Sequence, residues 1–138
     1  MKILGIDHIS IATGDISGLR EIFERLFGME GGPVESNLAN KVTLSFLDFG
    51  NINVELIEPT VEDSPISKFL EKRGPGIHHF CVLVDDIDRA LEELLAKNVK
   101  LLDRKPRVGA GGARIAFIHP DSAGGILIEL KEQKPKSH

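Results

Sequence analysis

Two copies of one short pattern lie 71 positions apart in the sequence, and this repeat constrains the fold more than any other feature. Residues 5–11 read Gly-Ile-Asp-His-Ile-Ser-Ile, and residues 76–82 read Gly-Ile-His-His-Phe-Cys-Val. Phe46 matches Phe117 at the same offset, and Glu55 matches Glu129 at an offset of 74, because the second hairpin has a longer turn. The repeat predicts two copies of one supersecondary unit, each with a histidine on its first strand.

Residue spacing indicates the elements of each copy. In the first copy, we expect a strand over 2–12 and a helix from about Leu19 to Phe27 that ends at Gly28. An irregular segment over 34–38 is expected next. Strands over 42–49 and 53–57 then follow, joined by a turn at Gly50-Asn51. Ser64 and Pro65 are typical of a helix start and predict a linker helix over 64–73. In the second copy, we expect a strand over 79–84, a helix over 88–97 with Asp86 or Asp88 as its cap, and strands over 100–103, 114–118 and 126–130.

Together these elements predict an α+β fold in a single domain over residues 1–138. Two tandem βαβββ modules, approximately 3–59 and 76–131, would form an open, curved mixed β-sheet around a metal cleft. Each module has one apolar sheet face to bury, so the helices would cover the outside. The polar tail over 131–138 is expected to fray.

Composition excludes several classes of protein. A formal net charge of -4 gives no reason to expect nucleic acid as a partner. No apolar run approaches the roughly 20 residues of a membrane span, and no signal peptide is indicated. Cys81 is the single cysteine, which fits a reducing compartment and predicts a cytoplasmic protein with a buried packing thiol.

Four polar residues stand at equivalent positions of the repeat: His8, His79, Glu55 and Glu129. Each glutamate lies between two branched aliphatic residues on a strand, so its side chain points to the opposite face from theirs. A lone strand histidine or glutamate is more often structural than a ligand. Two imidazoles and two carboxylates at matched positions instead favour an octahedral divalent metal with two positions left for water or substrate.

The remaining histidines and the basic glycine-rich loop are less specific. His78 faces away from His79 and is expected to be structural, and His119 is expected to form loop hydrogen bonds. The run from Arg107 to Arg114 contains Gly111 and Gly112, which allow a ligand to approach the backbone closely. Arg107, Gly111, Gly112 and Arg114 are therefore candidates for binding an anionic substrate tail, and a solvated loop is the alternative.

These residues together resemble the vicinal oxygen chelate superfamily and, within it, the methylmalonyl-CoA epimerases. The resemblance covers nearly the whole chain and is carried by Gly-Ile-His-His-Phe over 76–80, Val-Asp-Asp-Ile-Asp over 84–88, the run over 109–120 and Gly-Ile-Leu-Ile-Glu-Leu over 125–130. It implies a cytoplasmic, usually dimeric enzyme that interconverts the 2R and 2S forms of methylmalonyl-CoA, an acyl-CoA thioester. It also implies a divalent metal, with cobalt first and manganese, nickel or zinc as alternatives.

Carried over residue by residue, the resemblance makes His8, His79 and Glu129 metal ligands and puts Glu55 at the fourth ligand position. One departure is Leu44, which stands where a characterised bacterial member has a catalytic glutamate. Because leucine cannot accept a proton, we expect Glu129 and Glu55 to serve as the two bases, with Asp48 or Glu35 as alternatives to Glu55.

The implied mechanism is α-proton abstraction through a metal-stabilised enolate. The alternative enzyme is glyoxalase I, whose two histidine and two glutamate ligands are the same set. A non-catalytic small-molecule-binding protein of the same fold is the alternative from another class. An iron-dependent ring-cleaving dioxygenase is disfavoured because Glu55 would fill a position that its site leaves open.

Overall fold

A computed structural model describes residues 1–133, which separate into two compact units. The N-terminal unit comprises residues 8–78, and the C-terminal unit comprises residues 79–133 together with residues 1–7. Two strands run from one unit into the other along the chain, namely β1 (Ile3–Ala12) and β5 (Gly76–Val84).

The N-terminal unit contains a mixed sheet in the order β2-β3-β4-β1. Strand β1 pairs in parallel with β4 (Asn53–Pro59), whereas β3 (Val42–Asp48) is antiparallel to both β4 and β2 (Glu35–Asn37). The segment expected to be irregular over 34–38 therefore contains a short edge strand. The predicted turn at Gly50-Asn51 connects β3 to β4, and Gly50 has a φ of 90° that glycine adopts without strain.

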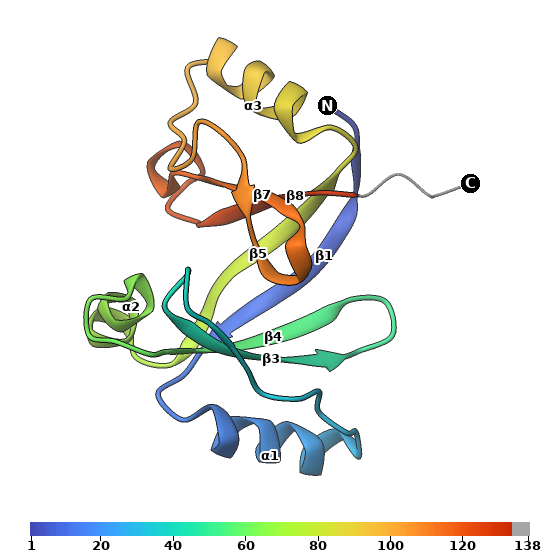
Figure 1. Ribbon diagram of the computed structural model, residues 1–138, viewed down its shortest axis with the longest axis vertical. Coiled ribbons are helices and arrows are strands. Elements are labelled where there is room, and N and C mark those ends of the chain that lie inside the picture. The colour runs from blue at the N-terminus through green and yellow to red at the C-terminus, as the bar shows by residue number, and fades with distance from the viewer. Residues whose placement is uncertain (134–138) are drawn as a thin grey trace. The chain divides into compact units, whose positions relative to one another are not determined.

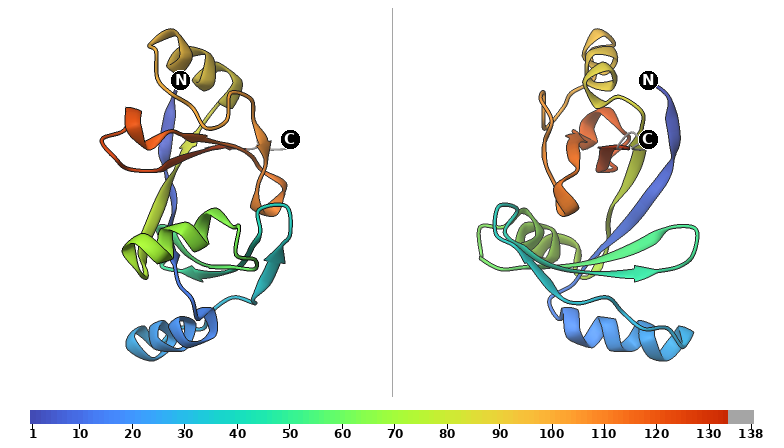
Figure 2. Two further views of the ribbon diagram at one scale, coloured as in Figure 1. Left: turned by 90° about the vertical axis from the view of Figure 1, so that its left-hand side faces the viewer. Right: turned by 45° about the vertical axis from the view of Figure 1, so that its right-hand side comes forward.

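Helix α1 (Ile16–Phe27) packs on one face of this sheet, along the β3–β4 hairpin (Figures 1 and 2). The Asp15 side chain accepts a hydrogen bond from Gly18 N and caps the helix, and Gly28 ends it in a left-handed conformation, as predicted. The core beneath the helix consists of Ile16, Leu47, Val54 and Leu56. Val54 and Leu56 flank Glu55 in β4, so the helix covers the face opposite to Glu55.

Helix α2 (Pro65–Arg73) confirms the predicted linker helix. Ser64 caps it by accepting a hydrogen bond from Ile66 N, and Pro65 stands at its first position, where a missing N–H costs nothing. The ring of His78 packs edge-on against Phe69 of this helix, with ring centroids 4.9 Å apart. The expectation that His78 is structural agrees with this contact.

The C-terminal unit repeats the arrangement with the order β5-β8-β7-β6. Strand β5 pairs in parallel with β8 (Ile128–Glu132), which is antiparallel to β7 (Arg114–Ile118), and β7 is antiparallel to β6 (Arg107–Val108). Helix α3 (Ile87–Ala96) lies over this sheet (Figure 1), and Asp86 is its cap, while Asp88 lies in its first turn. Ile87, Ala90 and Leu91 pack on Val84, Ala116 and Leu130.

The predicted α+β fold with two βαβββ modules is thus confirmed, but the C-terminal unit differs from expectation in two places. Strand β8 continues to Glu132, so the expected fraying is wrong for residues 131 and 132, and residues 134–138 of the expected tail lie outside the described residues. The strand expected over 100–103 is reduced to an isolated bridge between Leu101 and Ile118. The strand at this sheet edge is β6, inside the segment that was assigned to a loop. Across residues 1–133, the helices are too short or too polar to span a lipid bilayer.

Candidate active site

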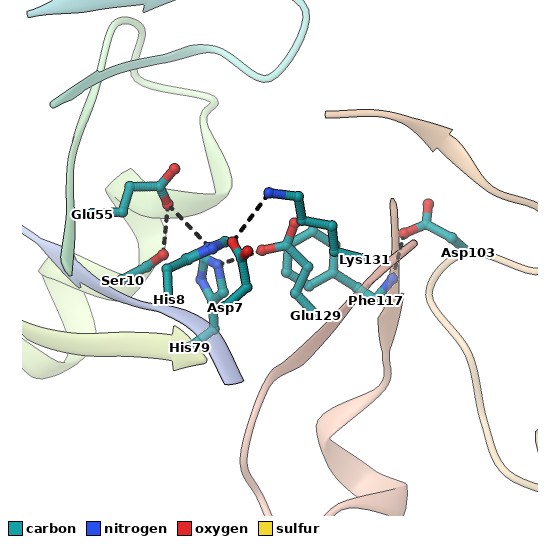
Figure 3. Close-up of polar contacts among 9 residues, drawn as sticks. All are labelled: Asp7, His8, Ser10, Glu55, His79, Asp103, Phe117, Glu129 and Lys131. Atoms are coloured by element: carbon teal, nitrogen blue, oxygen red, sulfur yellow. Dashed lines mark hydrogen bonds and ion pairs between the residues drawn. The ribbon is translucent and has the colours of Figure 1, made fainter. Parts of the chain in front are cut away.

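The N-terminal unit holds His8 and Glu55 side by side on the sheet face that α1 leaves uncovered. His8 lies in the middle of β1, and Glu55 lies in β4. His8 Nε2 is 3.8 Å from Glu55 Oε1 (Figure 3). The register pairs Ser10 with Glu55, and the Ser10 hydroxyl donates a 2.5 Å hydrogen bond to the same carboxylate oxygen. The result is a buried imidazole and a buried carboxylate on one surface.

The C-terminal unit holds the equivalent pair, His79 in β5 and Glu129 in β8. His79 Nε2 is 3.0 Å from Glu129 Oε1, within hydrogen-bond distance (Figure 3). Helix α3 covers the opposite face of this sheet, through the residues that alternate with Glu129. The predicted orientation of both glutamates, away from the helices, is therefore confirmed within each unit.

A phenylalanine accompanies each pair and shows how closely the units correspond. Phe46 lies across from Glu55 in β3–β4, and Phe117 lies across from Glu129 in β7–β8. Each ring meets the histidine of its own unit edge-on, at 6.2 Å for His8 and 5.2 Å for His79. The sequence repeat therefore reproduces three side chains, an imidazole, a carboxylate and a phenyl ring, in the same relation twice.

Burial makes these pairs unusual. The relative exposures of His8, Glu55, His79 and Glu129 are 5%, 7%, 6% and 6%. A carboxylate removed from water is costly unless hydrogen bonds or an opposite charge compensate it. A buried histidine–glutamate pair can be a structural ion pair, but a second pair at the equivalent register is better explained by a shared chemical purpose.

The donor set within each unit fits a divalent cation. Neighbouring ligands on an octahedral ion with bonds of 2.0–2.1 Å are about 3 Å apart. His79 Nε2 and Glu129 Oε1 are already at this separation, and His8 Nε2 and Glu55 Oε1 are slightly farther apart. Imidazole nitrogen with carboxylate oxygen suits cobalt, manganese, nickel and zinc alike, so the donors do not select one metal.

Carboxylates other than Glu55 on this face of the N-terminal unit have different environments. Asp48 accepts a hydrogen bond from Gly50 N at the β3–β4 turn, which gives it a structural task. Glu35 lies on the edge strand β2 directly across from Leu44, and its exposed side chain forms no ion pair or hydrogen bond within the described chain. Register places Leu44 and Glu35 on the same face as Glu55 and Phe46.

The two arginines predicted to bind substrate lie on opposite faces of the C-terminal sheet. Arg107 is paired with Ile115 in β6–β7, on the face of Phe117 and Glu129. Arg114 is one residue from Ile115 and points to the helix side, where it forms ion pairs with Asp88 (2.9 Å) and Glu132 (3.3 Å). Its hydrogen bond to Asp88 raises the pKa of the Arg114 guanidinium. The structure therefore brings Arg107, and not Arg114, to the side of His79.

The glycines between these arginines have separate conformational roles. Gly111 and Gly112 form the 3-10 turn η1 (Ala110–Gly112) with φ values of 70° and 77°, which glycine tolerates far better than other residues. A Cβ on either would meet open space, whereas one on Gly109 would clash with Ile115. Close ligand approach at Gly111 and Gly112 stays a prediction, and the turn geometry alone explains both residues.

Two residues near the site escaped the sequence analysis. Ser10 could have been found, because strand alternation places it on the face of His8, two residues earlier. Asp103 could not be found in this way, because the strand expected over 100–103 does not form. Its carboxylate accepts a hydrogen bond from Phe117 N at 2.9 Å and pairs with Arg107 at 3.1 Å. His119, by contrast, was predicted correctly, because its Nδ1 accepts a loop hydrogen bond from Asp121 N.

Comparison with known proteins decides the family. Residues 7–117 match the profile of the Glyoxalase/Bleomycin resistance protein/Dioxygenase superfamily. The chain belongs to this superfamily. It is 37% identical to the mitochondrial methylmalonyl-CoA epimerase of Dictyostelium discoideum over 93% of this chain and 78% of that protein.

Solved structures from this superfamily share the fold over almost the entire chain. The methylmalonyl-CoA epimerase of Mycobacterium tuberculosis superposes with a TM-score of 0.90 at 36% identity, covering 96% of this chain and 90% of that one. A methylmalonyl-CoA epimerase in complex with methylmalonyl-CoA and NH4+ superposes with a TM-score of 0.88 at 34% identity, covering 96% of each chain. The resemblance found in the sequence is thereby confirmed.

Proposed function

We propose that this protein interconverts the 2R and 2S epimers of methylmalonyl-CoA by removing and returning the α-proton. The observation that carries the proposal is the matched pair of buried histidine–glutamate sites at equivalent register positions. The epimerases of similar sequence and fold support methylmalonyl-CoA as the substrate of this protein, since one of them was solved with methylmalonyl-CoA bound.

In this proposal, His8, Glu55, His79 and Glu129 are the ligands of one divalent ion. When bound, the ion supplies Lewis-acid stabilisation of the negative charge that develops on the thioester oxygen. The buried surroundings of all four side chains support this role, because charge stabilisation is stronger where water is excluded. Cobalt is the first candidate, as the family resemblance implies.

Proton transfer requires an acceptor on each side of the α-carbon. We assign these roles to Glu129 and Glu55, because each forms a buried pair with the imidazole of its own unit. The hydroxyl of Ser10 holds Glu55 in one orientation, and the imidazole of His79 does the same for Glu129. Glu35 is the alternative to Glu55, since its exposed carboxylate stands on the same face.

Glyoxalase I is the second enzyme that this donor set suits, because its ligands are also two histidines and two glutamates. The similarity to methylmalonyl-CoA epimerases in both sequence and fold favours the epimerase. A homodimer and a cytoplasmic location, both implied by the resemblance, stay predictions.

Two parallel assays test the proposal. The cobalt-loaded protein is expected to exchange the α-proton of methylmalonyl-CoA with deuterated water and to convert either epimer into the mixture. It is expected to leave the hemithioacetal of methylglyoxal and glutathione unchanged. Turnover of the hemithioacetal without exchange of the α-proton of methylmalonyl-CoA would overturn the epimerase assignment in favour of glyoxalase I. Inactivity toward both substrates would favour a non-catalytic binding protein.

A further inference from the structure

We propose that Arg107 binds the free carboxylate of the acyl group, so that the protein selects 2-carboxyacyl thioesters over plain acyl thioesters. This inference rests on the proposed function, because it takes the reacting acyl group to lie beside His79 and Glu129. It adds the residue that would recognise the substrate class. All the observations that carry it lie within the C-terminal unit.

Register places Arg107 on the correct face and at a suitable distance from the reacting group. Strand pairing aligns Arg107 with Ile115 and Lys131, and aligns Phe117 with Glu129 in the next row of the same face. Strands are about 4.8 Å apart and successive same-face residues about 6.6 Å apart, so the Arg107 and Glu129 backbones are separated by about 12 Å. The long arginine side chain can cover much of this separation, leaving room for a small acyl group.

The Arg107 guanidinium is held by an ion pair to Asp103 and by the Phe117 ring. Its Nε pairs with Asp103 Oδ1 at 3.1 Å, and its plane lies over the Phe117 ring, with Cζ 5.3 Å from the centroid. Asp103 is itself fixed by the hydrogen bond from Phe117 N (Figure 3). The same Phe117 ring meets His79 edge-on at 5.2 Å, so one phenyl ring separates the guanidinium from the imidazole.

A guanidinium fixed through Nε presents the geometry that a carboxylate prefers. Arginine has five N–H donors in a planar fork, so it can serve Asp103 and a second carboxylate together. The Arg107 side chain keeps 45% of its surface exposed, so ligand can reach it. Lys131 is the other cation in this row, but its ammonium pairs with Asp7 at 3.1 Å and offers a point charge without a fork.

The position of Arg107 also distinguishes an acyl carboxylate from a phosphate of CoA. In methylmalonyl-CoA, the carboxylate is attached to the α-carbon that reacts, whereas the phosphates lie at the far end of the pantetheine arm. A cation one phenyl ring away from His79 is next to the reacting atoms. We therefore assign the Arg107 guanidinium to the acyl carboxylate. Binding measurements with ligands that lack this carboxylate distinguish it from a CoA phosphate.

Titration calorimetry of the cobalt-loaded protein with malonyl-CoA, propionyl-CoA and CoA tests this assignment. Arg107→Gln is expected to weaken malonyl-CoA binding by roughly tenfold to a hundredfold, the range for a charge-assisted hydrogen-bonded pair. Propionyl-CoA and CoA, which lack the carboxylate, are expected to bind as they do to the wild type. The matched control is Arg89→Gln, which removes one exposed charge from α3 on the opposite side of the sheet.

Two results would overturn the inference: equal weakening of all three ligands, which would assign Arg107 to a CoA phosphate, or unchanged binding of malonyl-CoA. Circular dichroism establishes that the variant is folded. If Arg107→Gln does not fold, Arg107→Lys is used, and a selective loss of malonyl-CoA affinity is expected because lysine keeps the charge without the fork. A selective loss in a protein that exchanges no α-proton would keep this inference and overturn the proposed function.

Discussion

Glu55 and Glu129 occupy equivalent register positions in the two units, each across an antiparallel strand pair from a phenylalanine and beside a histidine on the neighbouring parallel strand. A single buried ion pair would be an ordinary structural feature. Its repetition, with the helix of each unit on the opposite sheet face, supports the proposal that both carboxylates serve the same chemistry.

Replacing either site histidine should lower metal affinity. For His8→Ala and for His79→Ala, we expect the affinity for cobalt to fall by roughly a hundredfold or more, because a ligand bond is lost. Titration of the metal-free protein, followed by metal analysis after gel filtration, measures this. His119→Ala is the matched control, since the contacts of the His119 ring are with Asp121 in its own loop. Undiminished cobalt affinity in both site variants would contradict the metal assignment.

The Glu129→Gln variant should lose α-proton exchange. An amide cannot accept the proton, so we expect the rate of deuterium incorporation into methylmalonyl-CoA to fall by roughly a hundredfold to ten-thousandfold. Metal content is measured in the same samples, because Glu129 is also assigned as a ligand. Near-normal exchange in this variant would remove Glu129 from the mechanism.

The identity of the second base is tested by comparing Glu55→Gln with Glu35→Gln. Each epimer is incubated separately in deuterated water, because loss of one base should stop exchange from one epimer more than from the other. We expect Glu55→Gln to show this asymmetry and Glu35→Gln to exchange both epimers as the wild type does. The reverse pattern would move the role to Glu35, across from Leu44 on the edge strand.

The repeat in the sequence predicted two units of the same strand–helix–strand–strand–strand order. Most elements within each unit could also be predicted, because helix caps and apolar periodicity are local signals. Ser64 with Pro65, and Gly28 at the end of α1, are examples in which one or two residues determine an element boundary. Strand alternation was likewise enough to orient Glu55 and Glu129. The four candidate ligands could be named for this reason, since they depend only on the repeat and on the period of a strand.

The edge strand β6 could not be predicted, because its two residues lie among glycines, proline and arginines with low strand propensity. The strand β6 forms because it pairs with β7, and this pairing is a tertiary contact that local sequence does not reveal. The same pairing places the side chains of Arg107 and Arg114 on opposite faces of the sheet. Edge-strand register also makes Arg107 the counterpart of Glu35, since their partners Ile115 and Leu44 are 71 positions apart.

The core beneath α1 should be sensitive to truncation. Leu47 is fully buried between the sheet and the helix, so Leu47→Ala is expected to lower the free energy of unfolding by about 2–5 kcal/mol. Leu38→Ala is the matched control, because Leu38 is 81% exposed and should change it by less than about 0.5 kcal/mol. Urea unfolding followed by circular dichroism measures both. Equal effects would contradict the described packing.

Asp85 should contribute to stability in a pH-dependent manner. The backbone N–H of Lys2 donates to Asp85 Oδ1 at 2.9 Å and holds the pKa of this carboxyl below its ordinary value of 3.8. A lowered pKa in the folded state stabilises the protein above pH 3.8, and this contribution is lost as the pH falls through the folded-state pKa. Asp85→Asn should therefore be less stable than the wild type at neutral pH, and the difference should shrink in acid. A difference that stays constant down to about pH 2 would contradict the linkage.

Deuterium incorporation at the α-carbon of methylmalonyl-CoA, measured with and without a metal chelator, tests the central claim most directly. The account predicts exchange by the metal-loaded protein, its loss after chelation, and its recovery when cobalt is returned. Exchange that persists undiminished in the chelated, metal-free protein would contradict the assignment of His8, Glu55, His79 and Glu129 to a catalytic metal.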